Sequence, residues 1–170
     1  MRFDVVTSIF ALLILSACVA PKNYILKSEF DANQAQKQLA NGNNTISGEA
    51  FLRQSGGGVV TCAGYEVLLV PETPYAQERI GLIYGNTIKG YNPLYNRITF
   101  TPDYPEYYLS QKRKVCSSTG HFEFKNVKDG TYFVVATVLW TVPNAGYQGG
   151  TFMEKITVKD KENYEVILTY

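Results

Sequence analysis

The stretch that decides the fold is Thr119-Gly120-His121-Phe122-Glu123-Phe124-Lys125-Asn126-Val127-Lys128-Asp129-Gly130-Thr131-Tyr132. Phe122 and Phe124 are separated by one residue, so both point to the same face of a strand and into a core. Asp129-Gly130 is a turn pair, and the run 131–140 that follows it is rich in β-branched and aromatic residues. The stretch therefore predicts a strand, a tight turn and a second strand.

Short strand-like runs bounded by turn residues continue on both sides of this stretch, a pattern typical of a β-sandwich. The flanking runs are 46–52, 59–61, 65–70, 152–158 and 164–169. We therefore expect an all-β fold, a single antiparallel sandwich of about seven strands.

One short helix is predicted before the strands, at roughly 28–41. Ser28 is placed to cap it, with Asp31 three residues later, and Gly42 supplies a stop. A second short helix is predicted at 75–84, because the polar residues there do not alternate as a strand requires.

The deciding stretch resembles the carboxypeptidase regulatory-like, or transthyretin-like, β-sandwich, whose signature runs G-x-F-x-F-x-x-V-x-x-G-x-Y. The residues that fill it are Gly120, Phe122, Phe124, Val127, Gly130 and Tyr132. The resemblance extends over most of residues 44–170 and implies a module without catalytic activity that serves as a spacer or binding platform. The insertion at 91–111 and the N-terminal helix lie outside the simple pattern and are the expected sites of individual function.

The N-terminus resembles the signal peptide of a bacterial lipoprotein. An apolar run from Val5 to Leu15 follows Arg2, and Leu15-Ser16-Ala17-Cys18 closes it. The run is shorter than the ~20 residues that span a bilayer. The resemblance implies cleavage before Cys18 and acylation of that cysteine, including palmitate, whereas an ordinary cleaved signal peptide and a transmembrane anchor are the alternatives.

The expected organisation is a signal peptide at 1–17, a lipidated tether at 18–25, a helical segment at 26–43 and the sandwich at 44–170. Several acyl chains would hold the protein on a membrane stably. Val19 follows the cysteine where an Asp favours inner-membrane retention in enterobacterial lipoproteins, so we expect a lipid-anchored protein of the bacterial outer membrane.

The charge and the cysteines restrict the function classes. The formal net charge is +1, which gives no general attraction to nucleic acid. With Cys18 assigned to lipid, Cys62 and Cys116 form a pair, and an oxidising compartment favours a disulfide between them over two free thiols. We interpret the basic cluster 112–114 as a solvated edge.

No catalytic constellation is evident in the sequence, and we expect neither an enzyme nor a cofactor. The only histidine, His121, occupies a variable position of the fold motif and is expected in an exposed turn. One histidine and three cysteines also make a zinc site improbable, so no metal is expected. Four glutamates, Glu49, Glu66, Glu72 and Glu78, carry no spacing that pairs them as acids.

Aromatic residues are the candidates for binding a partner, since a tyrosine ring is rigid and its hydroxyl can be satisfied at a surface. The candidates are Tyr91, Tyr95, Tyr104, Tyr107, Tyr108 and Trp140. The first hypothesis is docking of an envelope protein through the 91–111 segment, and the alternative is binding of glycan or cell-wall fragments through Trp140 and the tyrosines. A third reading packs these rings into the domain itself. Neither the partner nor the oligomeric state follows from the sequence.

Overall fold

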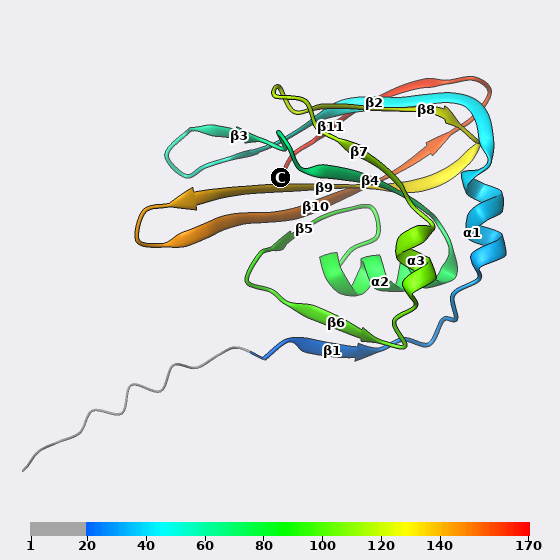
Figure 1. Cartoon of the computed structure of the whole chain (residues 1–170), viewed down its shortest axis with the longest axis horizontal. Helices are drawn as coiled ribbons and strands as arrows, with labels where there is room; N and C mark the ends of the chain where they lie inside the picture. Colours follow the sequence, from blue (N-terminus) through cyan, green and yellow to red (C-terminus); the bar gives the residue numbers. More distant parts are fainter. Residues whose placement is uncertain (1–19) are drawn as a thin grey trace, which may run out of the picture.

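The computed structural model describes residues 20–170, which form a mostly β protein with three helices and eleven strands (Figure 1). The strand count corrects the expected seven, because the N-terminal segment, the region around 91–111 and the basic cluster 112–114 add strands of their own. The elements in chain order are β1 (Lys22–Ile25), α1 (Ala32–Leu39), β2 (Asn41–Arg53), β3 (Val59–Thr61), β4 (Glu66–Pro71), α2 (Pro74–Tyr84), β5 (Lys89–Pro93), β6 (Ile98–Thr101), α3 (Pro105–Leu109), β7 (Lys112–Val115), β8 (His121–Val127), β9 (Gly130–Val142), β10 (Gly146–Val158) and β11 (Asn163–Leu168).

Two sheets face each other across the main core. One has the order β5-β10-β9-β4-β7, and the other contains β11, β2 and β3, with β8 also paired to β2. Ile46 and Phe122 from the second sheet pack with Leu69, Val134 and Phe152 from the first. This sandwich-like arrangement is the coarse architecture that the alternating strands predict. The expectation of a wholly antiparallel sandwich is wrong, because β11 pairs with β2 in parallel.

The deciding stretch folds as its pattern indicates. Phe122 and Phe124 on β8 are 2% and 1% exposed, and both belong to the main core. Gly130 has a φ of +150°, which an L side chain rarely adopts. Buried Tyr132 donates its hydroxyl to the backbone oxygens of Lys128 and Gln38, at 2.9 Å each. This phenol fastens the turn before β9 to the end of α1.

The pair Cys62 and Cys116 forms a disulfide in the structure. Their Cα atoms are 5.7 Å apart, and both side chains are buried in the main core. The bond links the end of β3 to the end of β7, across a separation of 54 residues. It therefore joins the two sheets at one end of the sandwich.

A third layer covers the outer face of the five-stranded sheet, as Figure 1 shows below β4, β9 and β10. Helices α2 and α3 and the small sheet of β1 and β6 form it. Tyr75 and Ile80 of α2, Tyr107 of α3 and Phe100 of β6 pack with Phe133 of the sheet. The predicted second helix is confirmed as α2, capped by the Thr73 side chain, which accepts from the backbone N–H of Ala76.

The N-terminal segment differs from the sequence expectation. Residues 22–25 of the predicted tether form β1, which pairs in parallel with β6. Helix α1 begins after Asp31, whose carboxylate accepts from the N–H of Gln34, and not after Ser28. The N–H of Ser28 instead donates to Glu78 at 2.8 Å. Helix α1 ends at Leu39 and is shorter than predicted. Gly42, the expected stop, lies within β2.

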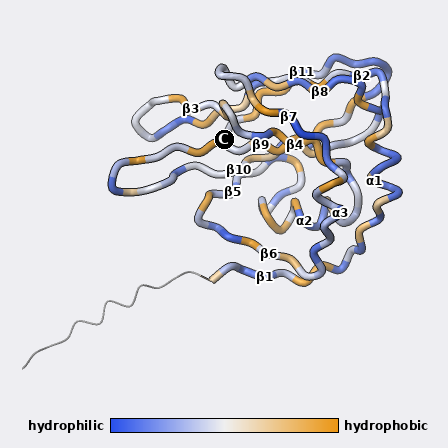
Figure 2. The backbone as a smooth tube through the Cα atoms, in the orientation of Figure 1, coloured by the Kyte–Doolittle hydropathy of each residue, from blue (hydrophilic) through white to orange (hydrophobic). Residues whose placement is uncertain are grey.

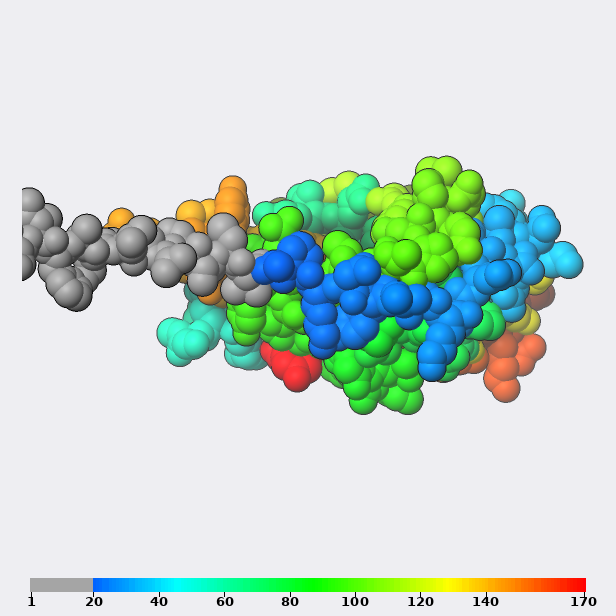
Figure 3. Space-filling model, turned by 90° about the horizontal axis from the view of Figure 1, so that it is seen from below, coloured from blue at the N-terminus to red at the C-terminus, as the bar shows by residue number. Residues whose placement is uncertain are grey.

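Helix α1 is mostly hydrophilic and buries only Ala35, so it lies at the edge of the domain (Figure 2). Leu26 and Phe30 precede the helix and pack in the third layer. Figure 3 shows the N-terminal segment, in blue, running across the surface of that layer. Among residues 20–170, no helix has the length and apolar character needed to cross a membrane.

Candidate functional site

An open groove of about 390 Å³ lies at one end of the five-stranded sheet, and four of its nine lining residues are aromatic. The lining residues are Tyr91, Pro93, Leu94, Tyr95, Trp140, Ala145, Tyr147, Gln148 and Gly149. We call this hollow the aromatic groove. It contains three of the six predicted aromatic residues, Tyr91, Tyr95 and Trp140.

The β9–β10 hairpin places Trp140. Trp140 lies directly opposite Gln148 in the strand ladder, and two residues earlier on β9 Val138 faces the main core. Trp140 therefore points to the inner side of the sheet, at the end where its strands extend into the hairpin. It packs against the core while remaining part-exposed.

Gly149 makes room for the Trp140 ring. Its φ is +103°, and a Cβ built on it would lie 2.9 Å from Cζ3 of Trp140. That distance is shorter than a real Cβ tolerates, and the backbone oxygen of Val138 is closer still. The absent side chain lets the indole lie against the floor of the groove.

Tyr91 comes from β5, where it is opposite Phe152 of β10 and shares its inner face. Its ring stacks on Tyr170, with centroids 5.1 Å apart and planes 20° from parallel. Burial raises the pKa of the Tyr91 hydroxyl, and the nearby Tyr95 raises it further. The phenol therefore stays protonated at neutral pH and can both donate and accept a hydrogen bond.

The turn from Pro93 to Asn96 holds Tyr95 over the groove. The N–H of Asn96 donates to the oxygen of Pro93, and the N–H of Leu94 donates to the oxygen of Gly149, both at 2.9 Å. The Asn96 amide also donates to the Asn92 side chain at 2.6 Å. These bonds fix the backbone of the turn to β10. Tyr95 itself is 82% exposed, so its ring is open to a ligand while its backbone is held in place.

Tyr147 also lines the groove and was not singled out from the sequence. It is 66% exposed and lies at the start of β10, opposite Thr141. Tyr147 could have been found from the predicted hairpin. Folding 131–158 about its Pro143–Gly146 loop brings residues 147 and 148 beside Trp140. The N–H of Ala145 donates to the oxygen of Val142 within that loop.

A second hollow of about 360 Å³ adjoins the aromatic groove. Its lining residues are Gln54, Ser55, Trp140, Val142, Ala145 and Gln148. Gln54 and Ser55 belong to the turn between β2 and β3, and Figure 1 shows this hairpin and the β9–β10 hairpin projecting from the same end of the molecule. We call this hollow the hairpin hollow.

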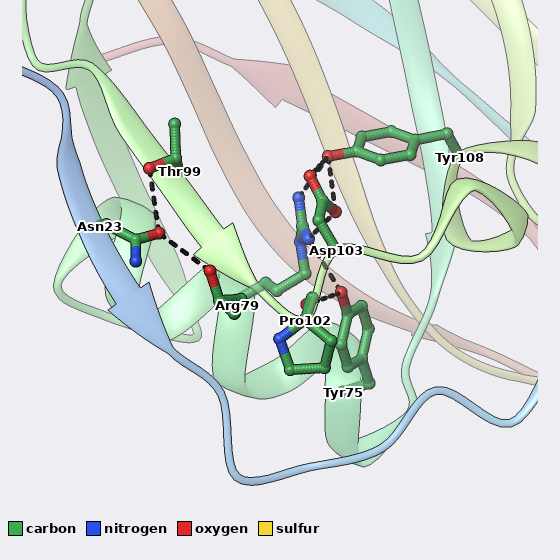
Figure 4. Close-up of polar contacts among 8 residues, drawn as sticks. Asn23, Tyr75, Arg79, Thr99, Pro102, Asp103 and Tyr108 are labelled. Atoms are coloured by element: carbon green, nitrogen blue, oxygen red, sulfur yellow. Dashed lines mark hydrogen bonds and ion pairs between the residues drawn. The ribbon is translucent and has the colours of Figure 1, made fainter.

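The other three predicted tyrosines, Tyr104, Tyr107 and Tyr108, lie elsewhere, in the third layer. Figure 4 shows Tyr108 beside Arg79. Tyr107 is 6% exposed, and burial raises its pKa strongly. Arg79 donates to the Tyr108 hydroxyl and to the Asp103 carboxylate, both at 2.6 Å, and Tyr108 also donates to Asp103. Tyr104 packs against Tyr75. The segment 91–111 is thus divided between the groove and the third layer.

The remaining candidate residues do not converge on a reactive site. His121 is exposed at the start of β8. Glu66 pairs with Arg113, and Glu72 pairs with Lys155. Glu78 accepts from the N–H groups of Lys27 and Ser28, and the bond from Lys27 is the main cause of its lowered pKa. Within the described residues, no three His, Cys, Asp or Glu side chains gather as metal ligands would.

Two further predictions concern the N-terminus and the basic cluster. Cys18 lies outside the described residues. Lys112, Arg113 and Lys114 form most of β7, an edge strand that pairs only with β4. Charges on an edge strand prevent pairing with other chains, which agrees with a solvated edge.

No family model matches the chain, and no curated protein matches it either. Among solved structures, the chain is similar to a Pseudomonas aeruginosa protein described as a "putative carbohydrate binding protein", with a TM-score of 0.69. The match covers 84% of this chain and 99% of the other at 20% identity. A likeness at that identity shows a shared fold.

Proposed function

We propose that this protein is a carbohydrate-binding module and that the aromatic groove is its binding site. The observation that carries the proposal is the concave surface formed by Trp140 with Tyr91, Tyr95 and Tyr147. Aromatic rings offer a flat apolar face for the C–H face of a sugar ring, while phenol and indole groups hydrogen-bond its hydroxyls. A few polar groups in a largely apolar hollow are typical of small-ligand sites.

The support of the groove fits this function. Trp140 rests on the core and on Gly149, and the Tyr95 turn is bonded to the Gly149 backbone. Rings that are already positioned lose little conformational entropy when a ligand binds. The fold likeness to a protein described as a "putative carbohydrate binding protein" points in the same direction.

A glycan array tests the proposal, with the intact protein compared with two variants. Trp140→Ala removes the central ring, and Tyr95→Ala removes an 82% exposed ring whose loss leaves the core intact. We expect both variants to lose binding to the glycans that the unmodified protein retains. The matched control is Leu109→Ala, which truncates a 79% exposed side chain on α3, outside both hollows, and should bind normally.

Two outcomes would count against the proposal: no glycan retained by the folded protein, or retention that survives both substitutions. The first outcome makes protein docking, the first hypothesis from the sequence, the better account, whereas the second places the glycan site outside the aromatic groove. That hypothesis now rests on a smaller surface, because Tyr107 is buried and Tyr108 is engaged by Arg79 and Asp103. We further propose that the module has no catalytic activity.

The family and location expected from the sequence belong to the same proposal: a transthyretin-like sandwich anchored to the outer membrane through lipid on Cys18. One backbone contact limits how far the groove can lie from an anchor at Cys18. The N–H of Lys22 donates to the oxygen of Arg97, two residues after Tyr95. Lys22 is four positions after Cys18, a span of at most about 14 Å. An acyl anchor at Cys18 would therefore keep the groove near the membrane surface.

A further inference from the structure

The aromatic groove and the hairpin hollow share a wall. Trp140, Ala145 and Gln148 line both of them, so the two hollows adjoin along these side chains. Their volumes are about 390 and 360 Å³. Each is at the small end of the usual range for ligand sites, roughly 300–1,000 Å³. Together they form one surface that is longer than a single small ligand needs.

The two ends of this surface have different chemistry. Beyond Trp140 on one side are the rings of Tyr95 and Tyr147, and on the other are the amide of Gln54 and the hydroxyl of Ser55. The β2–β3 turn that carries Gln54 is held by its backbone, since the N–H of Gln54 donates to the oxygen of Gly58 at 2.8 Å. The turn that presents the Gln54 amide and the Ser55 hydroxyl is therefore held by its own backbone.

No Lys, Arg, His, Asp or Glu belongs to the lining of either hollow. Arg53 precedes the lining residue Gln54 and Arg97 follows Tyr95 by two positions, but neither arginine is a lining residue. A charged group bound here would lose hydration without gaining an ionic partner. Amides, hydroxyls and phenols instead donate and accept, which suits hydroxyl and acetamido groups of an uncharged sugar.

We infer that the ligand is an extended, uncharged oligosaccharide that occupies both hollows, with one sugar unit in the aromatic groove and another in the hairpin hollow. This inference rests on the proposed function and adds the ligand's length and charge. Trp140 would contact the sugar units in both hollows, while Gln54 and Ser55 would contact only the unit in the hairpin hollow. Affinity should therefore rise with chain length until both hollows are filled.

The test uses glycans of one neutral series that the array identifies, from a single sugar to a hexasaccharide, titrated by calorimetry. We expect the affinity to rise at least tenfold along the series and to change less than twofold between 50 and 500 mM salt, because no ion pair forms. In the double variant Gln54→Ala/Ser55→Ala, affinity for the longest sugar should fall about 5- to 10-fold, the effect of one or two lost hydrogen bonds. Affinity for the single sugar should stay unchanged.

Different failures separate the inference from the proposed function. If the intact protein binds no glycan, or if Trp140→Ala does not affect binding, both the inference and the proposed function are contradicted. Binding that depends on Trp140 but is as tight for one sugar as for six contradicts the extended ligand. Binding that depends on Trp140 and is confined to acidic or basic glycans, with a steep salt dependence, contradicts the uncharged ligand. The double variant truncates the part-exposed Gln54 and the exposed Ser55, neither of which belongs to the core, so its fold should be intact by circular dichroism.

Discussion

The indole of Trp140 occupies the space that a side chain on Gly149 would fill, with Cζ3 2.9 Å from the position of the missing Cβ. These residues lie on adjacent strands of the β9–β10 hairpin, and Gly149 also accepts the bond that fixes the Tyr95 turn. One glycine thus positions a ring from β9 and a ring from the β5–β6 connection.

We predict that Gly149→Ala weakens glycan binding and destabilises the protein. The added Cβ meets Trp140 and the Val138 backbone, and the φ of +103° is strained for any L residue. We expect a loss of about 1–3 kcal/mol in the free energy of unfolding, measured by urea denaturation. The control is Gly146→Ala, since Gly146 also has a positive φ, +72°, but open space around its Cβ position. Equal losses in the two variants would refute the packing argument.

The disulfide should contribute stability without forming the binding site. In the loop-entropy model, a bond that closes 54 residues stabilises the fold by about 4 kcal/mol. Cys62→Ala/Cys116→Ala should lower the free energy of unfolding by up to this amount. The folded fraction should still bind glycan, because neither cysteine lines either hollow. A variant that is fully folded yet does not bind would show that the bond shapes the groove.

The Arg79 cluster should be structural only. Asp103→Ala leaves a guanidinium that is 4% exposed without its carboxylate. We expect a loss of about 2 kcal/mol in the free energy of unfolding, less than for a fully buried pair because the Asp103 side chain is 41% exposed and water can replace it. Lys89→Ala, at the more exposed Lys89–Glu154 pair, is the control and should cost less than about 1 kcal/mol. Reduced glycan binding by folded Asp103→Ala would show that the two regions are coupled.

Stability should fall at alkaline pH, partly through Tyr84. Burial raises the pKa of its hydroxyl from 10.0 to about 12, opposed by the bond to Thr151. Between these two values the folded state holds a proton that the unfolded state has lost, so the free energy of unfolding decreases as pH rises from about 10 to about 12. Tyr84→Phe should show a shallower decrease over that window, measured as urea midpoints at several pH values. Parallel curves for the two proteins would refute this assignment.

The lipid anchor can be tested by intact mass. Protein purified from bacterial membranes should begin at Cys18 and carry the additional mass of its acyl chains, whereas Cys18→Ser should remain unacylated and leave the membrane fraction. Recovery of Cys18→Ser in the membrane with an uncleaved N-terminus would favour the transmembrane alternative.

The parts of the fold that depend on local pattern could be predicted from the sequence. Phe122 and Phe124 alternate, Thr73-Pro74 starts α2, and Gly85 ends it in a left-handed conformation. Pairings between distant segments could not be predicted. The parallel pairing of β1 with β6 joins Lys22 to Ile98, and no local residue preference encodes that contact.

Only part of the candidate site could be predicted, because its residues are brought together by pairings between distant segments. Tyr91 and Tyr95 line one groove with Trp140 because β5 pairs with β10. Tyr107 is buried in the third layer, and the exposed Tyr108 is held there by its bond from Arg79 of α2. All four tyrosines look alike in a sequence that lists them within 18 positions, from 91 to 108. Their separation is decided by long-range strand pairing and by one buried guanidinium.

Trp140 is the only tryptophan in the chain, so its fluorescence reports on the groove directly. Titrating the protein with the glycan that binds best on the array should change the intensity or emission wavelength of this residue in a saturable way. The dissociation constant from fluorescence should match the one from calorimetry. Calorimetric binding with unchanged tryptophan emission would place the sugar elsewhere and contradict the assignment of the groove.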